Sequence, residues 1–255
     1  MTTMSLGLSR DDRPILIAAL FILVILVAGT TYTIAHFGSA PLLSPTYLLQ
    51  QLQIGSFLGI VAAGMMIVIL IAQIDLSVPW TLAAAAMMAT SIGGPLAIPV
   101  GLGVGLLVGL VNGIGVAYLR VPSMIFTLGV NAVMRGLMVA HTSGYAPQTA
   151  ATELMRTLAS EHTLGIPNAL FVWASVSVLA ATLAGVLLAG YSTKAYQAMG
   201  DVYLLPSIAA VVIGGTNILG DRGRYLGTLV GVVLIVLLNS VLSIMAMPGA
   251  GRQVI

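Results

Sequence analysis

Long apolar runs dominate this chain of 255 residues and set the elements that it can form. Asp, Glu, Lys and Arg are absent from Pro14 to Ile74, from Leu76 to Leu119 and from Tyr225 to Gly251. A helix that crosses the hydrocarbon core of a bilayer needs about 20 apolar residues. The pattern predicts eight such segments, at Pro14 to about His36 and at residues 52–72, 76–93, 96–119, 122–142, 166–190, 202–219 and 225–247.

We expect these segments to be helices, because the alternation over about ten residues that marks a membrane strand is absent. Several are short or contain a proline, namely Pro79, Pro99 or Pro206. Helices break inside a membrane where protein or a cavity surrounds the break. The sequence therefore predicts an all-α fold: a polytopic transmembrane helical bundle with broken or short helices, in which residues 1–255 form a single domain.

Polar residues occupy few stretches, and the longest runs from Ser143 to Leu164. Within it, Leu154 and Leu158 share one helical face while Glu153 and Arg156 lie outside it, which predicts a short amphipathic surface helix. The uncharged run after the N-terminus is too long for a cleaved signal peptide, so we expect an uncleaved span and a cytoplasmic N-terminus. The longest polar stretch then faces the periplasm.

Composition narrows the classes of function. Apolar residues make up 59% of the chain, charged residues only 6%, and mean hydropathy is +1.10, whereas about 25% of an ordinary soluble domain is charged. A net charge of +2 without a basic patch gives no nucleic-acid surface. With no Cys and three scattered His, we expect no metal site or cofactor. No Gly-Lys-Ser/Thr triplet or catalytic constellation occurs, so the chain is expected to have no ATP site and not to be an enzyme.

A polar stripe follows one face of the fifth predicted segment, because Ser123, Thr127, Asn131 and Arg135 recur every four residues. A charged group at membrane depth faces protein or water, which makes the stripe a candidate solute path. The alternative is an Arg that reaches the interface, with Ser and Thr bonded to their own helix.

The sequence Ile74-Asp75-Leu76-Ser77-Val78-Pro79 predicts a helix break and restart. Asp or Ser ahead of an apolar run, with Pro in the first turn, is typical of a helix N-cap. We therefore favour capping by Asp75 or Ser77 ahead of Pro79, with a proton-carrying carboxylate as the alternative.

Two sets of glycines stand out. Glycines recur every four residues in the fourth segment and predict close helix packing along one seam, with a sliding contact as the alternative. A second, glycine-rich stretch precedes Asp221 and Arg222 and predicts a turn between helices at a water interface. The first set is Gly101, Gly105, Gly109 and Gly113, and the second comprises Gly214, Gly215, Thr216 and Asn217.

Four blocks in this order resemble the permease subunits of bacterial ABC importers of ribose-like sugars, a family related to permeases for branched-chain amino acids. The blocks cover most of residues 55–245. They are Ile74-Asp75-Leu76-Ser77; Asn112-Gly113 leading to Leu119-Arg120-Val121-Pro122; Thr127-Leu128-Gly129 with Arg135-Gly136; and Ala209 to Thr216 continuing through Gly220, Gly223, Gly227 and Gly231. The resemblance implies a multi-pass protein of the bacterial inner membrane, surrounded by lipid. It also implies three partners, namely a separate ATP-binding subunit, a periplasmic solute-binding protein and a second permease subunit.

The chain departs from the family pattern in three regions. Ala72-Gln73 stands where the family usually has Gly-Gly, and Asp221 replaces a usual Gly. Near residues 178–182, two family spans and the cytoplasmic loop between them are merged into one segment. The loss of one crossing inverts the orientation of all later helices, unless the merged segment re-enters the membrane.

Three functions remain open from the sequence. The favoured one is the permease subunit of an ATP-driven importer for a sugar or similar small polar solute. The second is a secondary transporter or channel that uses Asp75 and Arg135. The third is a shortened, non-transporting subunit that assembles with a complete permease.

Overall fold

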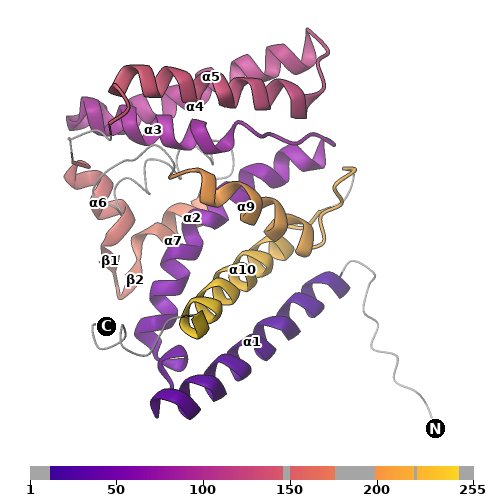
Figure 1. Ribbon diagram of the computed structural model, residues 1–255, viewed down its shortest axis with the longest axis vertical. Coiled ribbons are helices and arrows are strands. Elements are labelled where there is room, and N and C mark those ends of the chain that lie inside the picture. Colours follow the sequence, from indigo (N-terminus) through magenta and orange to yellow (C-terminus); the bar gives the residue numbers. More distant parts are fainter. Residues whose placement is uncertain (1–11, 146–149, 176–198, 221–222, 247–255) are drawn as a thin grey trace.

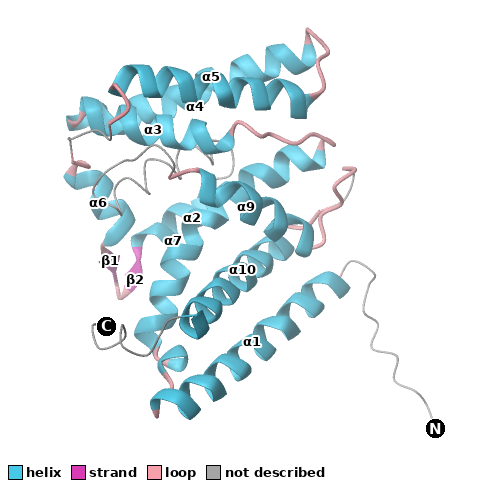
Figure 2. Ribbon diagram, in the orientation of Figure 1, coloured by secondary structure: helices cyan, strands magenta, loops and turns pink. Residues whose placement is uncertain are grey.

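In the computed structural model, nearly all regular structure is helical (Figures 1 and 2), as predicted from the sequence. The structure describes residues 12–145, 150–175, 199–220 and 223–246. The long helices are α1 (Arg13–Phe37), α2 (Pro45–Leu70), α4 (Ala97–Ala117), α5 (Ser123–Thr142) and α10 (Tyr225–Ala246). The shorter helices are α3 (Val78–Ile92), α6 (Glu153–Ser160), α7 (Asn168–Ser175) and α9 (Asp201–Ile213), with 3-10 turns η1 (Pro41–Leu43) and η2 (Gly94–Leu96). Two-residue strands β1 (His162–Thr163) and β2 (Ile166–Pro167) pair antiparallel.

Each of the eight predicted segments contains a helix in the described part of the chain, and five helices are long and apolar enough to cross a membrane. With 15 and 13 residues, α3 and α9 are shorter than a full span, since about 20 residues are needed. Pro79 and Pro99 lie in the first turns of α3 and α4, whereas Pro206 lies inside α9 without ending it. The predicted amphipathic surface helix is α6, but it buries Met155 and Ala159, whereas Leu154 of the predicted apolar face is 57% exposed. The merged region near residues 178–182 lies outside the described residues.

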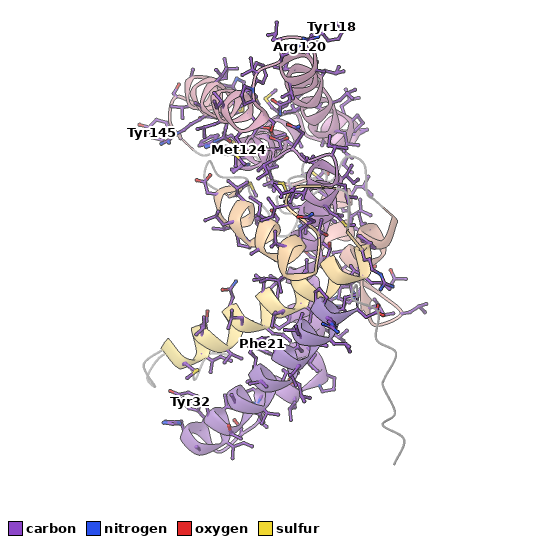
Figure 3. All side chains as sticks on the ribbon, turned by 90° about the vertical axis from the view of Figure 1, so that its right-hand side faces the viewer. Phe21, Tyr32, Tyr118, Arg120, Met124 and Tyr145 are labelled. Carbon is purple, nitrogen blue, oxygen red and sulfur yellow. The ribbon has the colours of Figure 1, made fainter. Side chains whose placement is uncertain are left out.

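The core is built around α2 and the short helix α3. Helix α2 contacts α7, α9 and α10, while α3 contacts α4, α5 and α9. The largest fully buried side chains include Phe57, Ile60, Leu82 and Met87 from these two helices. By contrast, α1 lies at the outside of the bundle against α10, and its Phe21 is 55% exposed (Figure 3). An outer helix with such a surface is suited to lipid.

The turn between α9 and α10 lies beside the start of α1. A Cβ added to Gly215 would come within 2.9 Å of Pro14, and Arg224 forms an ion pair with Asp12. Figure 1 shows the start of α1, the end of α2 and this turn at the same end of the bundle. The α9–α10 turn and the start of α1 therefore lie at the same end of the described bundle, while residues 176–198 lie outside the described residues.

Arginines gather at this end of the bundle. Arg13 begins α1, Arg224 precedes α10, and Arg120 lies in the α4–α5 turn that leads to Ser123, which lies beside Ile74 just after α2. Cytoplasmic ends of membrane helices are enriched in Arg and Lys. We therefore expect this end to face the cytoplasm, in agreement with the orientation predicted for the N-terminus.

The prediction that the α4 glycines pack along one seam against a neighbouring helix is wrong within this chain. Gly101 is buried, Gly105 is half-buried, and Gly109 and Gly113 are exposed, with no atom within 4 Å of a Cβ added at either of the last two. Because a turn contains 3.6 residues, a step of four advances the stripe by about 40° and turns it away from α3. The buried positions of α4 are Ala97, Gly101, Val108, Asn112 and Gly115.

Two of the glycines that approach another backbone very closely lie instead between α9 and α10. A Cβ at Gly227 would lie 1.9 Å from the carbonyl oxygen of Gly214, and one at Gly231 would lie 2.1 Å from that of Ala210. These distances are too short for any side chain, so glycine is required for the two backbones to approach. This contact fixes α10 against α9.

We expect Gly231→Ala to lower the free energy of unfolding by about 1–3 kcal/mol, because the added methyl group forces α10 away from α9. The matched control is Gly109→Ala, whose methyl group enters open space and which should change stability by less than about 1 kcal/mol. Unfolding of the purified protein in mixed detergent micelles measures both. Equal losses in the two variants would contradict the assignment of the contact.

Candidate functional site

A break of seven residues separates α2 from α3, at residues 71–77. Helix α2 ends with Ala72 in the left-handed region at φ 56°; the Ala72 N–H bonds to the Ile69 carbonyl at 2.8 Å and the Gln73 N–H to the Val68 carbonyl at 3.2 Å. This is the helix end at which glycine is usual, because a Cβ is strained there. The break thus persists with Ala72 at a position where the resemblance led us to expect glycine.

Side chains from α5 accept the backbone N–H groups that the break leaves unpaired. The N–H of Ile74 lies 3.4 Å from Ser123 Oγ, and the N–H of Leu76 donates to Thr127 Oγ1 at 2.9 Å. An unpaired backbone donor in a membrane costs several kcal/mol, because no water replaces the lost partner. These hydroxyls therefore hold a non-helical segment that would otherwise be unstable.

The four-residue spacing on α5 matches the geometry of an extended chain. Four residues of helix rise about 6 Å, and two residues of extended chain rise about 6.6 Å. Successive polar side chains at Ser123 and Thr127 can therefore meet every second N–H, those of Ile74 and Leu76. The predicted polar stripe is a ladder of hydrogen-bond acceptors for a parallel segment.

The next two members of the stripe meet the start of α3. Asn131 Oδ1 accepts the N–H of Trp80 at 3.2 Å, and the Arg135 guanidinium carbon lies 5.8 Å from the centre of the Trp80 ring. The contact with the ring is a cation–π interaction. All four stripe residues thus meet the break or α3. Their part in a solute path stays a prediction.

Asp75 does not cap α3 in the predicted manner. Its Oδ1 accepts the N–H of Ser77 at 2.8 Å and the Ser77 hydroxyl at 2.6 Å, so it closes a turn ahead of the helix. Ser77 is the N-cap residue but makes no side-chain cap bond. The first-turn N–H of Trp80 goes instead to Asn131, because Pro79 lacks an N–H and the neighbouring helix supplies the acceptor.

Asn112 from α4 completes this cluster, and the sequence analysis did not assign it a role. Its Nδ2 donates to Ser77 Oγ at 2.8 Å and lies 3.4 Å from Asp75 Oδ2. It is buried, and the signal that could have found it is a single amide within a long uncharged segment. Asp75 and Arg135 form no ion pair with each other in the described structure.

The second predicted glycine motif is a turn that ends α9. Asn217 Oδ1 accepts the Leu219 N–H at 3.1 Å, and the Asn217 carbonyl accepts the Gly220 N–H at 3.0 Å. Gly214 is the C-cap and Gly215 has a φ of 94°. Thr216 is buried, and its N–H bonds to the carbonyl of Val211 at 3.1 Å. Asp221 and Arg222 lie outside the described residues.

These features define a polytopic α-helical membrane protein with an internally supported helix break. In the part of the chain that the structure describes, no three His, Asp or Glu residues lie close enough to hold a metal ion. The break is held by neutral hydrogen bonds and one carboxylate. Such an arrangement suits positioning and movement of a helix within the membrane.

Comparison with known proteins identifies the family. Residues 47–164, which include the break and its α5 ladder, match the model for the permease component of branched-chain amino acid transport systems. The ribose import permease of Bacillus subtilis is 32% identical, over 89% of this chain and 83% of its own length. That of Haemophilus influenzae is 30% identical, over 73% and 74%. The chain belongs to this family of import permeases and is a multi-pass protein of the inner membrane.

More distant relatives agree with this assignment. The ribose import permease of Escherichia coli K12 is 28% identical, over 84% of each chain. An autoinducer 2 import permease from the same species is 26% identical, over 80% of this chain and 62% of its own length. No solved structure matches.

We expect Thr127→Val to lower the free energy of unfolding by about 1–3 kcal/mol, because it leaves the Leu76 N–H without its acceptor. Thr90→Val is the matched control, since Thr90 is equally buried but its hydroxyl only donates to carbonyls of its own helix, those of Ala86 and Met87. Unfolding in mixed micelles compares them. Equal stability of the two variants would show that the ladder does not support the break.

Proposed function

We propose that this chain is the membrane-spanning permease subunit of an ATP-driven importer for a sugar or a similar small polar solute. Family membership carries the proposal, because relatives that align over most of their length are ribose import permeases. The broken helix supports it, since broken helices within membranes surround solute sites in transport proteins. The candidate secondary transporter loses support, because Asp75 is occupied by Ser77 and Asn112.

Energy and delivery of solute come from partners in this proposal. A separate ATP-binding subunit drives the cycle, a periplasmic solute-binding protein supplies the solute, and a second permease subunit completes the membrane part. The arginine-bearing end of the bundle, with the α9–α10 turn, is the surface available to the ATP-binding subunit. The α6 and β1–β2 region at the opposite end is available to the binding protein.

In this proposal, the α5 ladder sets the position of α3 during transport. An ATP-driven cycle requires two states whose contacts differ. Hydrogen bonds from Asn131 and Thr127 to a segment without helical bonds of its own can be exchanged as the segment moves. The stripe thus contributes to transport through the break, whether or not it also touches solute.

A specific observation favours the third candidate, the shortened non-transporting subunit. The alignment with the Escherichia coli permease is 270 positions long, but it includes only 84% of this 255-residue chain. Many aligned positions are therefore gaps in this chain. The relative therefore has residues for which this chain has no counterpart. If these include the cytoplasmic loop, the chain should bind an ATP-binding subunit weakly and assemble with a complete permease instead.

Uptake in cells distinguishes the two candidates. Cells without their own ribose permease, supplied with this chain and with its cognate ATP-binding and solute-binding proteins, should accumulate radiolabelled ribose in an ATP-dependent manner. Asn131→Leu should reduce the rate about tenfold, because loss of one buried hydrogen bond is worth about 1.4 kcal/mol. Leu128→Ala, on the exposed face of α5, should leave the rate within about twofold.

No uptake, together with co-purification of a complete permease, would replace the proposal by the non-transporting subunit. Uptake that needs no ATP-binding subunit would favour a secondary transporter. Equal uptake rates for Asn131→Leu and the unmodified chain, at equal amounts in the membrane, would show that the α5 stripe does not contribute to transport.

A further inference from the structure

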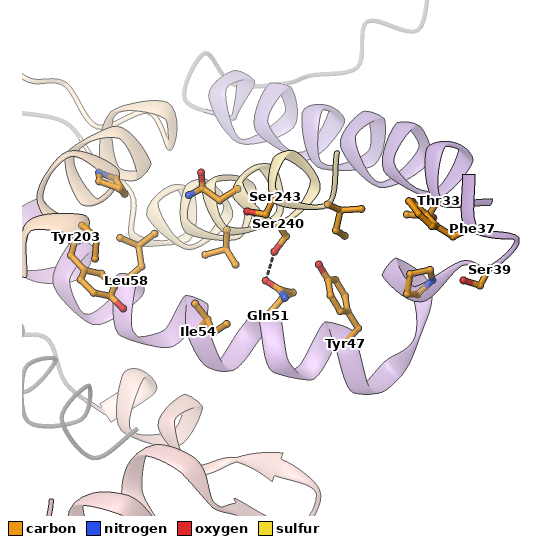
Figure 4. Close-up of a pocket in the computed structure, with 16 residues that line it drawn as sticks. Thr33, Phe37, Ser39, Tyr47, Gln51, Ile54, Leu58, Tyr203, Ser240 and Ser243 are labelled. Atoms are coloured by element: carbon orange, nitrogen blue, oxygen red, sulfur yellow. Dashed lines mark hydrogen bonds between the residues drawn. The ribbon is translucent and has the colours of Figure 1, made fainter. Parts of the chain in front are cut away.

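A cavity of about 760 Å³ lies between α1, α2, α9 and α10 (Figure 4), apart from the helix break. Ligand sites typically have volumes of about 300–1,000 Å³. The cavity is lined by Phe37 at the end of α1, Tyr47 near the start of α2, and Ser243 near the end of α10. These positions lie toward the end of the bundle opposite the α9–α10 turn, so we expect the cavity to open toward the periplasmic half.

Neutral hydrogen-bonding groups gather on one wall. Gln51 Oε1 accepts the Ser240 hydroxyl across the cavity, joining α2 to α10 (Figure 4). Asn239 and Ser243 line the same wall from α10, and their side chains have no hydrogen-bond partner among the described residues. An amide and a hydroxyl that lack protein partners are suited to a solute that donates and accepts hydrogen bonds.

Charge is absent from this cavity. None of the 16 lining residues within the described structure carries a formal charge. A charged solute at membrane depth requires an opposite charge or costs several kcal/mol. The lining therefore favours an uncharged solute over a phosphorylated sugar or an amino acid.

Aromatic and aliphatic side chains form the remainder of the wall. Phe37 and Tyr47 flank the end near α1, and Ile54 and Leu58 continue along α2 (Figure 4). Such surfaces can pack against the C–H groups of a small polyol while amides and hydroxyls bind its O–H groups. The cavity thus combines the two kinds of contact that one uncharged polyhydroxylated molecule offers.

We propose that this cavity binds an uncharged polyhydroxylated solute of monosaccharide size through Gln51, Asn239, Ser240 and Ser243. The proposal rests on the permease function given above and places a solute site within it. Helix α9 contributes both to the cavity and to the contact with α3. Its Tyr203 lines the cavity. Gly200, at its start, meets Pro79 of α3, because a Cβ added to Gly200 would lie 1.9 Å from the Pro79 carbonyl oxygen. Occupancy of the cavity is thereby linked to the start of the broken helix.

A single thiol tests the site directly, because the chain contains no cysteine. Ile244→Cys, which lines the cavity but is not one of the four proposed binding residues, is made in the full chain, purified in lipid nanodiscs without any partner, and labelled with a small maleimide. D-ribose at about ten times its dissociation constant should slow labelling about tenfold, since occupied sites are protected by mass action. Ribose 5-phosphate at the same concentration should leave the rate unchanged.

Two controls make the result specific. Tyr145→Cys, 74% exposed beyond the end of α5, should label at the same rate with and without ribose. Asn239→Leu added to Ile244→Cys should abolish the protection without altering the labelling rate in the absence of sugar, because it removes one of the proposed polar contacts.

Equal labelling of Ile244→Cys with and without ribose, up to the solubility of the sugar, would overturn the site. Equal protection by ribose 5-phosphate would overturn the uncharged class. The assay needs no ATP-binding subunit, so protection without uptake in cells would uphold the cavity and reject the importer, whereas uptake without protection would do the reverse.

Discussion

The structure depends on the hydrogen-bond acceptors that pair with the backbone N–H groups of a break in a membrane helix. In water an interrupted helix binds solvent, but in a bilayer each unpaired donor costs several kcal/mol. Here Ser123, Thr127 and Asn131 accept three of these donors and Asp75 accepts a fourth. Because the first three acceptors lie on one face of α5, the break requires α5 in register beside it, with Asn112 of α4 against Ser77.

This arrangement gives the short helix α3 a defined place in the core. It packs against α4, α5 and α9, and its first turn is fixed by Asn131 on one side and by the glycine contact at Gly200 on another. Helix α9 in turn is held to α10 through Gly227 and Gly231. The proposed solute cavity and the helix break therefore share α9, so a movement of this helix changes both.

Much of the fold could be predicted from the sequence, and the limits have physical causes. Apolar run length placed the helices, because in a membrane length and hydropathy decide which segments span. The α5 stripe was recognised from its spacing, but its partner was not, because backbone N–H groups of a distant segment leave no mark in composition. The α4 glycine seam failed since four-residue steps drift around a helix; Gly109 therefore faces outward. The cavity was missed because four helices contribute to it.

Amide hydrogen exchange across residues 73–80 tests the central claim most directly. In the unmodified protein, the amides of Leu76 and Trp80 should be protected although they form no helical hydrogen bond. Thr127→Val should raise exchange in this segment about tenfold, which corresponds to about 1.4 kcal/mol, and Thr90→Val should not change it. Rapid exchange of the segment in the unmodified protein, or equal exchange in all three proteins, would contradict the account of the α5 ladder.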